Sequence, residues 1–249
     1  CDYCKNKREH LCPKRVLLGM NRPIERQGCF AELVLTPDKN IYELPEGLDI
    51  KKAPIAEPTA VSLHAVELGE EVLKKDLKNS KVLIIGGGAI GLLCALILEK
   101  YKKCQEIILV EPNEKRLKVC NNYLDSDTFK PDNKRITDNS FDIVFDTVGL
   151  EITRQNSIKA VSPGGVIVHI GLTQPSGTFN FRKATLQEIT FVGTYCYTNK
   201  DFEKTLNILA NNSLGKLEWI EYRELNKGAE AFKEIHNGTC SAPKIILIP

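Results

Sequence analysis

The sequence predicts an α/β protein with a doubly wound, parallel sheet, and three observations support this. Short apolar runs alternate with segments of helical periodicity from about residue 53 onward. The first buried run, KVLII at 81–85, leads directly into the glycine-rich stretch GGGAIG at 86–91. The 249 residues, 42% hydrophobic and 27% charged, suit a globular protein with one large or two modest domains. Strands that alternate with helices form parallel sheets.

The individual elements follow from their patterns. The predicted strands are KVLII (81–85), EIILVEP (106–112), FDIVFDTVG (141–149), VIVHIG (166–171) and ITFVGTYCY (189–197). One predicted helix begins after Pro58, and four others cover residues 89–101, 113–123, about 150–161 and 201–212. In the last of these helices Phe202, Leu206 and Leu209 share one face. The stretch SPGG before residue 166 is interpreted as a turn.

Two further stretches have a different character. Residues 28–45 alternate apolar and polar side chains between turn signals, so short antiparallel strands are expected there. Residues 124–140 are polar and show no clear periodicity.

Charge and hydropathy exclude several partners. With 34 basic and 32 acidic side chains the net charge is +2, which gives no reason to expect nucleic acid or an anionic membrane as a partner. The longest apolar run, residues 82–98, falls short of the roughly 20 residues that a membrane span needs. No signal peptide is recognised.

The nine cysteines do not form a disulfide framework of the secreted kind, and reduced thiols in the cytoplasm are expected. Three of them, Cys1, Cys4 and Cys12, are clustered at the start of the chain. The CxxC spacing brings two sulfurs onto one metal, and the polar turn between Cys4 and Cys12 lets a third return. Zinc binding is therefore favoured over incidental surface thiols, although three thiolates leave one position of a tetrahedral site open.

The stretch GGGAIG contains the pattern GxGxxG as Gly86, Gly88 and Gly91. The pattern is weak alone, but here it follows a predicted strand and starts a predicted helix, as dinucleotide binding requires. The first glycine permits the tight turn, the second the close approach of a pyrophosphate, and the third close packing of helix on strand. The helix N-terminus at Ala89 and Ile90 then supplies amide donors to the phosphates.

An acidic residue is expected about 20 residues further on, at the end of the second strand. Glu111 occupies this place. A carboxylate there accepts the ribose hydroxyls and repels a 2′-phosphate, so NAD is favoured over NADP. Arg116 is close enough in sequence to reach the ribose, which weakens the argument against NADP. The alternative is a solvated glutamate at a strand end.

Together, the cysteine cluster, EPTAVSLHA, GGGAIG and the TVG and HIG strand ends resemble the zinc-dependent medium-chain dehydrogenases. The resemblance runs from Cys1 to Pro249 and is greatest to the polyol branch, which includes sorbitol, threonine and sugar-alcohol-phosphate dehydrogenases. It implies a Rossmann domain for NAD at residues 59–197. It also implies the remainder of a mainly β (GroES-like) catalytic domain, at 1–58 with the zinc lobe and at 198–249.

The same resemblance implies which residues bind the zinc ions. The family's structural zinc lobe has four cysteines, and Cys1, Cys4 and Cys12 match the second, third and fourth. The first, together with the cysteine and His-Glu pair of the catalytic zinc, would precede this sequence, so an N-terminally truncated chain is expected. Glu57 matches the family's carboxylate at the catalytic zinc, either as a ligand or bonded to the metal-bound water. Alternatively, it caps the helix that begins near Pro58.

Several other residues of this sequence match family positions that contact the cofactor. These residues are Val148, Gly149, Ile170, Gly171, Leu172, Thr194, Tyr195 and Lys244. Lys244 is expected to pair with the pyrophosphate, or else to be a solvated strand-edge lysine. His64, His169 and His236 are interpreted as structural. The family usually has a further strand and helix before FDIVFD, and the short stretch 124–140 puts that helix and part of the adenine pocket in doubt.

The resemblance implies a zinc-dependent oxidoreductase that transfers a hydride from a secondary alcohol or polyol to NAD, with little or no catalysis by residues 1–249 alone. Homodimers or homotetramers are expected by fold analogy. The main alternative is a non-catalytic NAD(H)-binding module or sensor. A nucleotide-fold methyltransferase and a zinc-free quinone reductase are disfavoured by the cysteines, and the quinone reductase also by Glu57.

Overall fold

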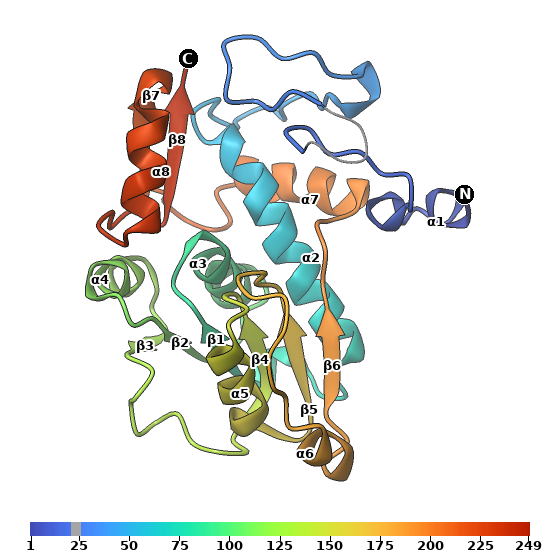
Figure 1. The fold of residues 1–249 in the computed structure, drawn as a ribbon, viewed down its shortest axis with the longest axis vertical. Coiled ribbons are helices and arrows are strands. Elements are labelled where there is room, and N and C mark those ends of the chain that lie inside the picture. Colours follow the sequence, from blue (N-terminus) through green and yellow to red (C-terminus); the bar gives the residue numbers. More distant parts are fainter. Residues whose placement is uncertain (21–25) are drawn as a thin grey trace.

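A computed structural model describes residues 1–20 and 26–249. Its centre is a six-stranded parallel sheet in the order β3-β2-β1-β4-β5-β6 (Figure 1). The strands are β1 (Lys81–Ile85), β2 (Glu106–Val110), β3 (Asp127–Phe129), β4 (Phe141–Asp146), β5 (Val161–His169) and β6 (Thr190–Gly193). The strand order reverses between β1 and β4, which is the arrangement of a doubly wound dinucleotide-binding sheet. The predicted fold class is confirmed.

The strands are buried on both faces, as parallel strands are. In β1 the side chains of Val82 and Ile84 join one hydrophobic core, while Leu83 and Ile85 join the other. Successive side chains on a strand point to opposite faces, so one run of apolar residues supplies both cores.

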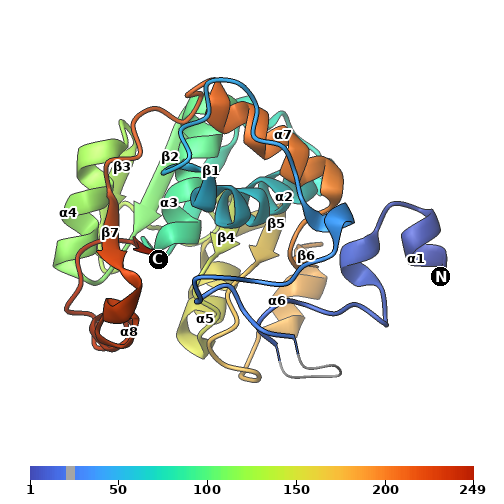
Figure 2. The ribbon, with the colours of Figure 1, turned by 90° about the horizontal axis from the view of Figure 1, so that it is seen from above.

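Helices cover the two faces. On one face lie α2 (Ala56–Val72), α3 (Ala89–Leu96) with its π-helical continuation (Ile97–Tyr101), and α7 (Asn199–Ala210). On the other lie α5 (Glu151–Ala160) and α6 (Phe181–Leu186), as Figure 2 shows from above. The remaining helices are α4 (Glu114–Tyr123) beside β3, α1 (Asp2–Lys5) and α8 (Gly228–His236). Short 3₁₀ turns lie at Glu9–Leu11, Asp38–Asn40, Ala53–Ile55, Leu77–Asn79 and Leu225–Lys227.

The antiparallel strands expected at 28–45 are absent from the described structure, and that prediction is wrong. The segment is an irregular strap with one 3₁₀ turn, and its apolar side chains face outward: Leu33 is 88% exposed and Leu35 is 84% exposed. A strand is stable only when its backbone N–H and C=O groups are paired with a neighbouring strand. Among the described residues, no strand runs beside the strap, so the alternating pattern has nothing to pair with.

Two connections also differ from expectation. The stretch SPGG is not a turn before a strand: β5 runs continuously from Val161, and the pairing partner of β4 jumps from Val161 to Val166, so these residues form a bulge. In the polar stretch 124–140 the strand β3 is present, but within the described structure no helix separates it from β4. The doubt about that helix is confirmed.

The end of the chain forms a small unit of its own, in which β7 (Ile220–Glu224) pairs in parallel with β8 (Lys244–Ile248) and α8 connects them. Figure 1 places this unit beside the start of α2, above α4. Two hydrogen bonds join the N-terminal segment to it and to the turn that follows α7. Tyr222 Oη donates to the Lys51 carbonyl over 3.1 Å, and Lys52 Nζ donates to Asn212 Oδ1 over 3.4 Å.

Candidate functional site

The glycine-rich turn lies at the carboxyl end of β1, where the strand order reverses. Gly86 has φ +105°, a left-handed conformation that favours glycine, and a Cβ there would lie 2.7 Å from Thr147 Oγ1. A Cβ on Gly91 would lie 1.8 Å from the carbonyl oxygen of Gly86. The fold itself therefore requires both of these glycines.

Gly88 is different. Its φ is −73°, and a Cβ built on it would meet no protein atom within 4 Å. It is the N-cap of α3, whose first turn begins with Ala89 and Ile90, so unpaired backbone amides and the positive end of the helix dipole face this open space. The space and the donors fit a phosphate group that approaches the backbone closely.

Glu111 follows β2 and is only 3% exposed. Its Oε2 accepts a hydrogen bond from the Gly87 amide over 2.8 Å, and its Oε1 accepts one from the Asn113 amide over 2.8 Å. Arg116 Nη2 lies 3.0 Å from the same Oε1. The carboxylate is therefore fixed beside the glycine turn and is not a solvated strand end. Arg116, on the first turn of α4, is within reach of any group bound at Glu111, as its spacing suggested.

Asp146 organises the loops after β4 and β5. It is fully buried, and its Oδ1 accepts hydrogen bonds from the amides of Val148 (3.1 Å) and Gly149 (2.9 Å). Its backbone carbonyl accepts from the amides of Ile170 (2.9 Å) and Gly171 (3.1 Å). Sequence reasoning missed this residue, although an acid at the end of a buried strand was a usable signal.

The two loops pack backbone against backbone, since a Cβ on Gly149 would lie 2.1 Å from the Gly171 carbonyl oxygen. This packing brings together four of the residues predicted to contact the cofactor. They are Val148, Gly149, Ile170 and Gly171, at the carboxyl edge of the sheet. The fifth, Leu172, follows them and is 81% exposed.

Thr194 and Tyr195 follow β6, next to these loops. The Thr194 amide donates to the His169 carbonyl over 3.1 Å, which holds the backbone of this segment against β5. The guanidinium carbon of Arg15 lies 4.6 Å from the centre of the Tyr195 ring. This cation–π contact joins the N-terminal segment to the same edge of the sheet, and no sequence signal singled Arg15 out.

Glu57 is the second residue of α2, and no side-chain hydrogen bond caps that helix. Burial raises the pKa of the Glu57 carboxyl, and the positive charge of Lys244 partly offsets this. Burial likewise raises the pKa of Tyr197, with the charge of Glu57 adding to the effect. The charge of Lys244 thus acts on Glu57, and the charge of Glu57 acts on Tyr197. Lys244 is the first residue of β8. Glu57 does not act as a side-chain helix cap.

The three clustered cysteines converge as predicted. The Sγ of Cys1 lies 3.6 Å from the Sγ of Cys4 and 3.6 Å from that of Cys12. Thiolates around tetrahedral zinc, with Zn–S bonds near 2.3 Å, stand about 3.8 Å apart. The Lys14 amide also points at Cys12 Sγ over 3.3 Å, a donor that stabilises a thiolate. These residues fit a structural zinc ion.

The cysteine lobe is held to the main body through two histidines. The His10 ring packs edge-on against the His64 ring, with centroids 5.0 Å apart. His64 Nδ1 lies 2.8 Å from Asp201 Oδ2, which links α2 to α7. Burial and the neighbouring His64 lower the pKa of His10. His64 has a structural partner here, in line with its interpretation.

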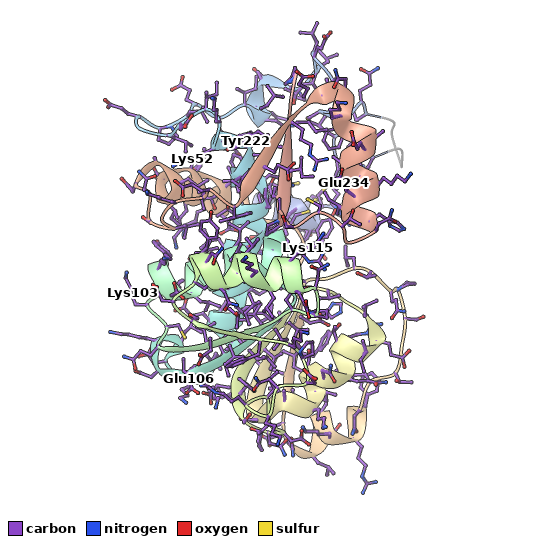
Figure 3. All side chains as sticks on the ribbon, turned by 90° about the vertical axis from the view of Figure 1, so that its left-hand side faces the viewer. Lys52, Lys103, Glu106, Lys115, Tyr222 and Glu234 are labelled. Atoms are coloured by element: carbon purple, nitrogen blue, oxygen red, sulfur yellow. The ribbon has the colours of Figure 1, made fainter. Side chains whose placement is uncertain are left out.

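The C-terminal unit contacts the cofactor edge through α4. Asn113 Nδ2 donates to the Gly238 carbonyl over 3.0 Å, and Lys115 Nζ donates to the Thr239 carbonyl over 3.2 Å. Figure 3 shows Lys115 on α4 facing the C-terminal unit. The backbone amide of Asn113 also donates to Glu111 Oε1. Asn113 alone therefore links Glu111 to the C-terminal unit.

In the part of the chain that the structure describes, the only group of three or more potential metal ligands is the cysteine lobe. Glu57 therefore has no cluster of ligands around it, and these residues do not fit a catalytic zinc ion. The glycine turn, the open Gly88 and the buried acid do fit a dinucleotide. Fold and site together define a dinucleotide-binding α/β protein with a zinc lobe.

Comparisons with known proteins agree with this class. Residues 89–211 match the family model described as zinc-binding dehydrogenase. A probable D-xylulose reductase A of Neosartorya fischeri is 25% identical over 96% of this chain and 68% of its own length. The (R,R)-butanediol dehydrogenase of Saccharomyces cerevisiae is 27% identical over 100% of this chain and 67% of its length.

Among solved structures, acetophenone reductase from Geotrichum candidum in complex with NAD superposes with a TM-score of 0.85. It is 19% identical to this chain, and the match covers 97% of this chain and 68% of that one. These findings support a medium-chain dehydrogenase/reductase of the zinc-binding type, and hence an oxidoreductase. No helix among the described residues is long and apolar enough to cross a membrane.

Proposed function

We propose that this oxidoreductase uses NAD to oxidise a polyol or another secondary alcohol. The observation that carries the proposal is the buried carboxylate of Glu111, held by the Gly87 amide beside the open Gly88 at the point where the strand order reverses. Gly88 and the start of α3 would hold the pyrophosphate, and Glu111 would accept the ribose hydroxyls. When bound, NAD supplies the acceptor for the hydride that leaves the alcohol carbon.

The substrate class comes from the relatives. The relatives are named as a D-xylulose reductase and an (R,R)-butanediol dehydrogenase, and this supports a small polyol as the substrate here. In the cytoplasm, where we place the protein, its nine free cysteines would remain reduced. The boundaries 1–58, 59–197 and 198–249 remain our proposed division into catalytic and cofactor parts.

The remaining chain residues would position the ligand. The loops at Val148–Gly149 and Ile170–Leu172 close the carboxyl edge, and Thr194 and Tyr195 would face the nicotinamide end. The charge of Lys244 acts on the Glu57 carboxyl, which supports a place for Lys244 near Glu57. Its pairing with the pyrophosphate remains our expectation. A homodimer or homotetramer remains our expectation.

The direct test is a titration of the purified chain with NADH, followed by the fluorescence of the bound nicotinamide. We expect saturable binding that NAD displaces and that is at least about tenfold weaker for NADPH, since the Glu111 carboxylate repels a 2′-phosphate. Absence of saturable NADH binding by the folded chain would overturn the proposal.

Turnover is a separate matter, because the residues present do not fit a catalytic zinc ion. We expect residues 1–249 alone to bind NAD yet to show little or no polyol oxidation, with or without added zinc. Zinc-dependent turnover of xylitol or sorbitol by this chain would contradict the expectation.

A further inference from the structure

The guanidinium of Arg154 bridges the loops after β4 and β5 at the carboxyl edge of the sheet. Arg154 lies in the first turn of α5. Its Nη1 donates to the carbonyl of Gly149, in the loop after β4, over 2.9 Å, and to the carbonyl of Gln174, in the loop after β5, over 3.2 Å. Its Nη2 donates to the carbonyl of Ser176, further along the second loop, over 2.6 Å. One side chain thus holds backbone carbonyls of both loops.

The loop after β5 is shaped to this guanidinium. Gly177 leaves the room that the side chain takes, since a Cβ on it would lie 2.8 Å from Arg154 Nη2. Arginine suits the place, because its planar fork donates several hydrogen bonds in fixed directions. Hydrogen bonds from a charged donor are also stronger than those between neutral groups. The contacts of Arg154 therefore fix where the middle of this loop lies relative to Gly149.

Other hydrogen bonds hold the loop on either side of this point. The Gln174 amide donates to the Gly149 carbonyl over 3.0 Å, and the Thr178 amide donates to Glu151 Oε1 over 3.2 Å. Among the described residues, the Ser176 carbonyl between them accepts a hydrogen bond from Arg154 alone. Loss of the guanidinium would therefore untie the middle of the loop and loosen its contact with Gly149.

The two loops belong to the half of the sheet that receives the second nucleotide. A dinucleotide binds across the point where the strand order reverses, with one mononucleotide on each half of the sheet. Glu111, the proposed acceptor of the adenosine ribose, follows β2 on one side of this point, whereas β4 and β5 lie on the other side. We therefore expect the loops that Arg154 bridges to meet the nicotinamide half of the cofactor.

We propose that Arg154 is a positioning residue for the nicotinamide half of the dinucleotide. It acts through Gly149 and through the loop that carries Leu172, and not by touching the cofactor itself. A loop that is loose before binding must be ordered when the ligand binds, and this lowers the affinity. Arg154 orders both loops in advance. This inference rests on the proposed binding of NAD at the glycine turn.

The test compares NADH with ADP, which has the adenosine and both phosphates but lacks the nicotinamide and its ribose. Both ligands are titrated by calorimetry into the native chain and into Arg154→Ala. We expect Arg154→Ala to weaken NADH by about tenfold or more and to change the affinity for ADP by less than about threefold, because only NADH reaches the loosened loops. A general loss of structure would weaken both ligands alike.

Two further variants complete the test. Arg154→Lys keeps the positive charge, but a single ammonium lacks the fork that spans the two loops, so NADH affinity should stay below the native value. This variant carries the test if Arg154→Ala does not fold. Arg182 is an exposed arginine of α6 without a side-chain hydrogen bond or ion pair in the described part of the chain. Arg182→Ala is the matched control and should bind both ligands as the native chain does.

Three results would overturn the positioning role while leaving the proposed function intact. They are an unchanged NADH affinity in Arg154→Ala, equal losses of NADH and ADP affinity in that variant, and full recovery of NADH affinity in Arg154→Lys. If the native chain does not bind NADH, the proposed function fails, and the inference fails with it.

Discussion

The three glycines of GxGxxG serve different physical purposes, although the sequence pattern treats them alike. Gly86 and Gly91 are required by the packing of the chain against itself. Gly88 is not, because its surroundings within 4 Å are empty of protein atoms. A position where the fold tolerates a side chain but the motif has none indicates that the space belongs to a ligand.

Exchange of Gly88 for alanine separates binding from folding. We expect Gly88→Ala to leave the free energy of unfolding within about 0.5 kcal/mol of the native chain. NADH affinity should fall by about tenfold or more, since a methyl group takes the place of a phosphate oxygen. Urea unfolding and NADH titration measure the two quantities.

Gly91→Ala is the matched variant, with its Cβ 1.8 Å from the Gly86 carbonyl. It should destabilise the fold by about 3 kcal/mol or more through overpacking. If the two variants lose stability equally, the distinct role of Gly88 is refuted.

The pair of Glu111 and Arg116 should set the preference between the two dinucleotides. In Glu111→Ala, Arg116 loses its carboxylate partner at 3.0 Å and is free to pair with a 2′-phosphate. We expect NADH affinity to drop and NADPH affinity to rise, which parallel titrations would detect. In Glu111→Ala with Arg116→Ala the gain for NADPH should disappear; a gain that survives would assign it to another residue.

For single residues, much of the site could be predicted from the sequence. Glu111 and the glycines are identified by their order along the chain, because a strand, a turn and a helix place them with little freedom. Asp146, Arg15 and His10 were not identified. The partners of Arg15 and His10 lie far away in sequence, and no periodicity records such contacts. Asp146 is a missed local signal, because its Oδ1 accepts from amides only two and three residues on.

Among the elements, α2 and α7 are joined by the contact between His64 and the buried Asp201, and the Asp201 carboxyl gives a pH dependence. Burial raises the pKa of Asp201, but hydrogen bonds from His64 and Thr198 outweigh it, so that the pKa falls from 3.8 to about 2. A carboxyl whose pKa is lowered in the folded state stabilises the fold above its unfolded pKa. This stability, about 2 kcal/mol, is lost as the pH falls from near 4 to near 2.

The change Asp201→Asn should therefore lower the free energy of unfolding at pH 6 and make progressively less difference as the pH falls to about 2 and below. Chemical unfolding of both proteins across this range is the measurement. A difference between the two proteins that does not change with pH would show that Asp201 acts only through its shape. Thr205→Val, a buried change on the same helix, is a control without a titrating group.

Elements with a strong period and local capping were predicted well, and elements that depend on distant partners were not. The strand β1 and the helix α4, with Asn113 as its cap, matched the predicted ranges closely. The strap at 28–45 carries the alternation of a strand but lies alone, because pairing is decided by a neighbour and not by the segment itself. The bulge in β5 has the same cause: SPGG has turn composition, and the adjacent β4 keeps it in the sheet.

For the molecule as a whole, the cysteine lobe offers a test of metal binding. We expect one zinc ion per chain to protect the thiols of Cys1, Cys4 and Cys12 from a thiol reagent, and a chelator to restore their reactivity, since the metal holds the thiolates. Cys29, which is exposed and distant from the lobe in sequence, is the internal control and reacts in both states. Equal reactivity with and without zinc would contradict the lobe assignment.

The strap at 28–45 presents apolar side chains over much of its length. The double change Leu33→Ser with Leu35→Ser should leave the free energy of unfolding within about 0.5 kcal/mol, because both side chains are already in water. It should lower the binding of a hydrophobic dye and the tendency to self-associate, measured by fluorescence and light scattering. A large loss of stability would show that the strap is packed in solution.

This exposed strap also bears on how stability is distributed over residues 1–249. Backbone amides exchange with solvent at rates set by the free energy of local opening, which is near zero for mobile loops and approaches the global value in core strands. Among the described residues no strand pairs with the strap, whereas β1 and β4 lie at the centre of the sheet. We therefore expect the strap amides to exchange with deuterium first and those of β1 and β4 last.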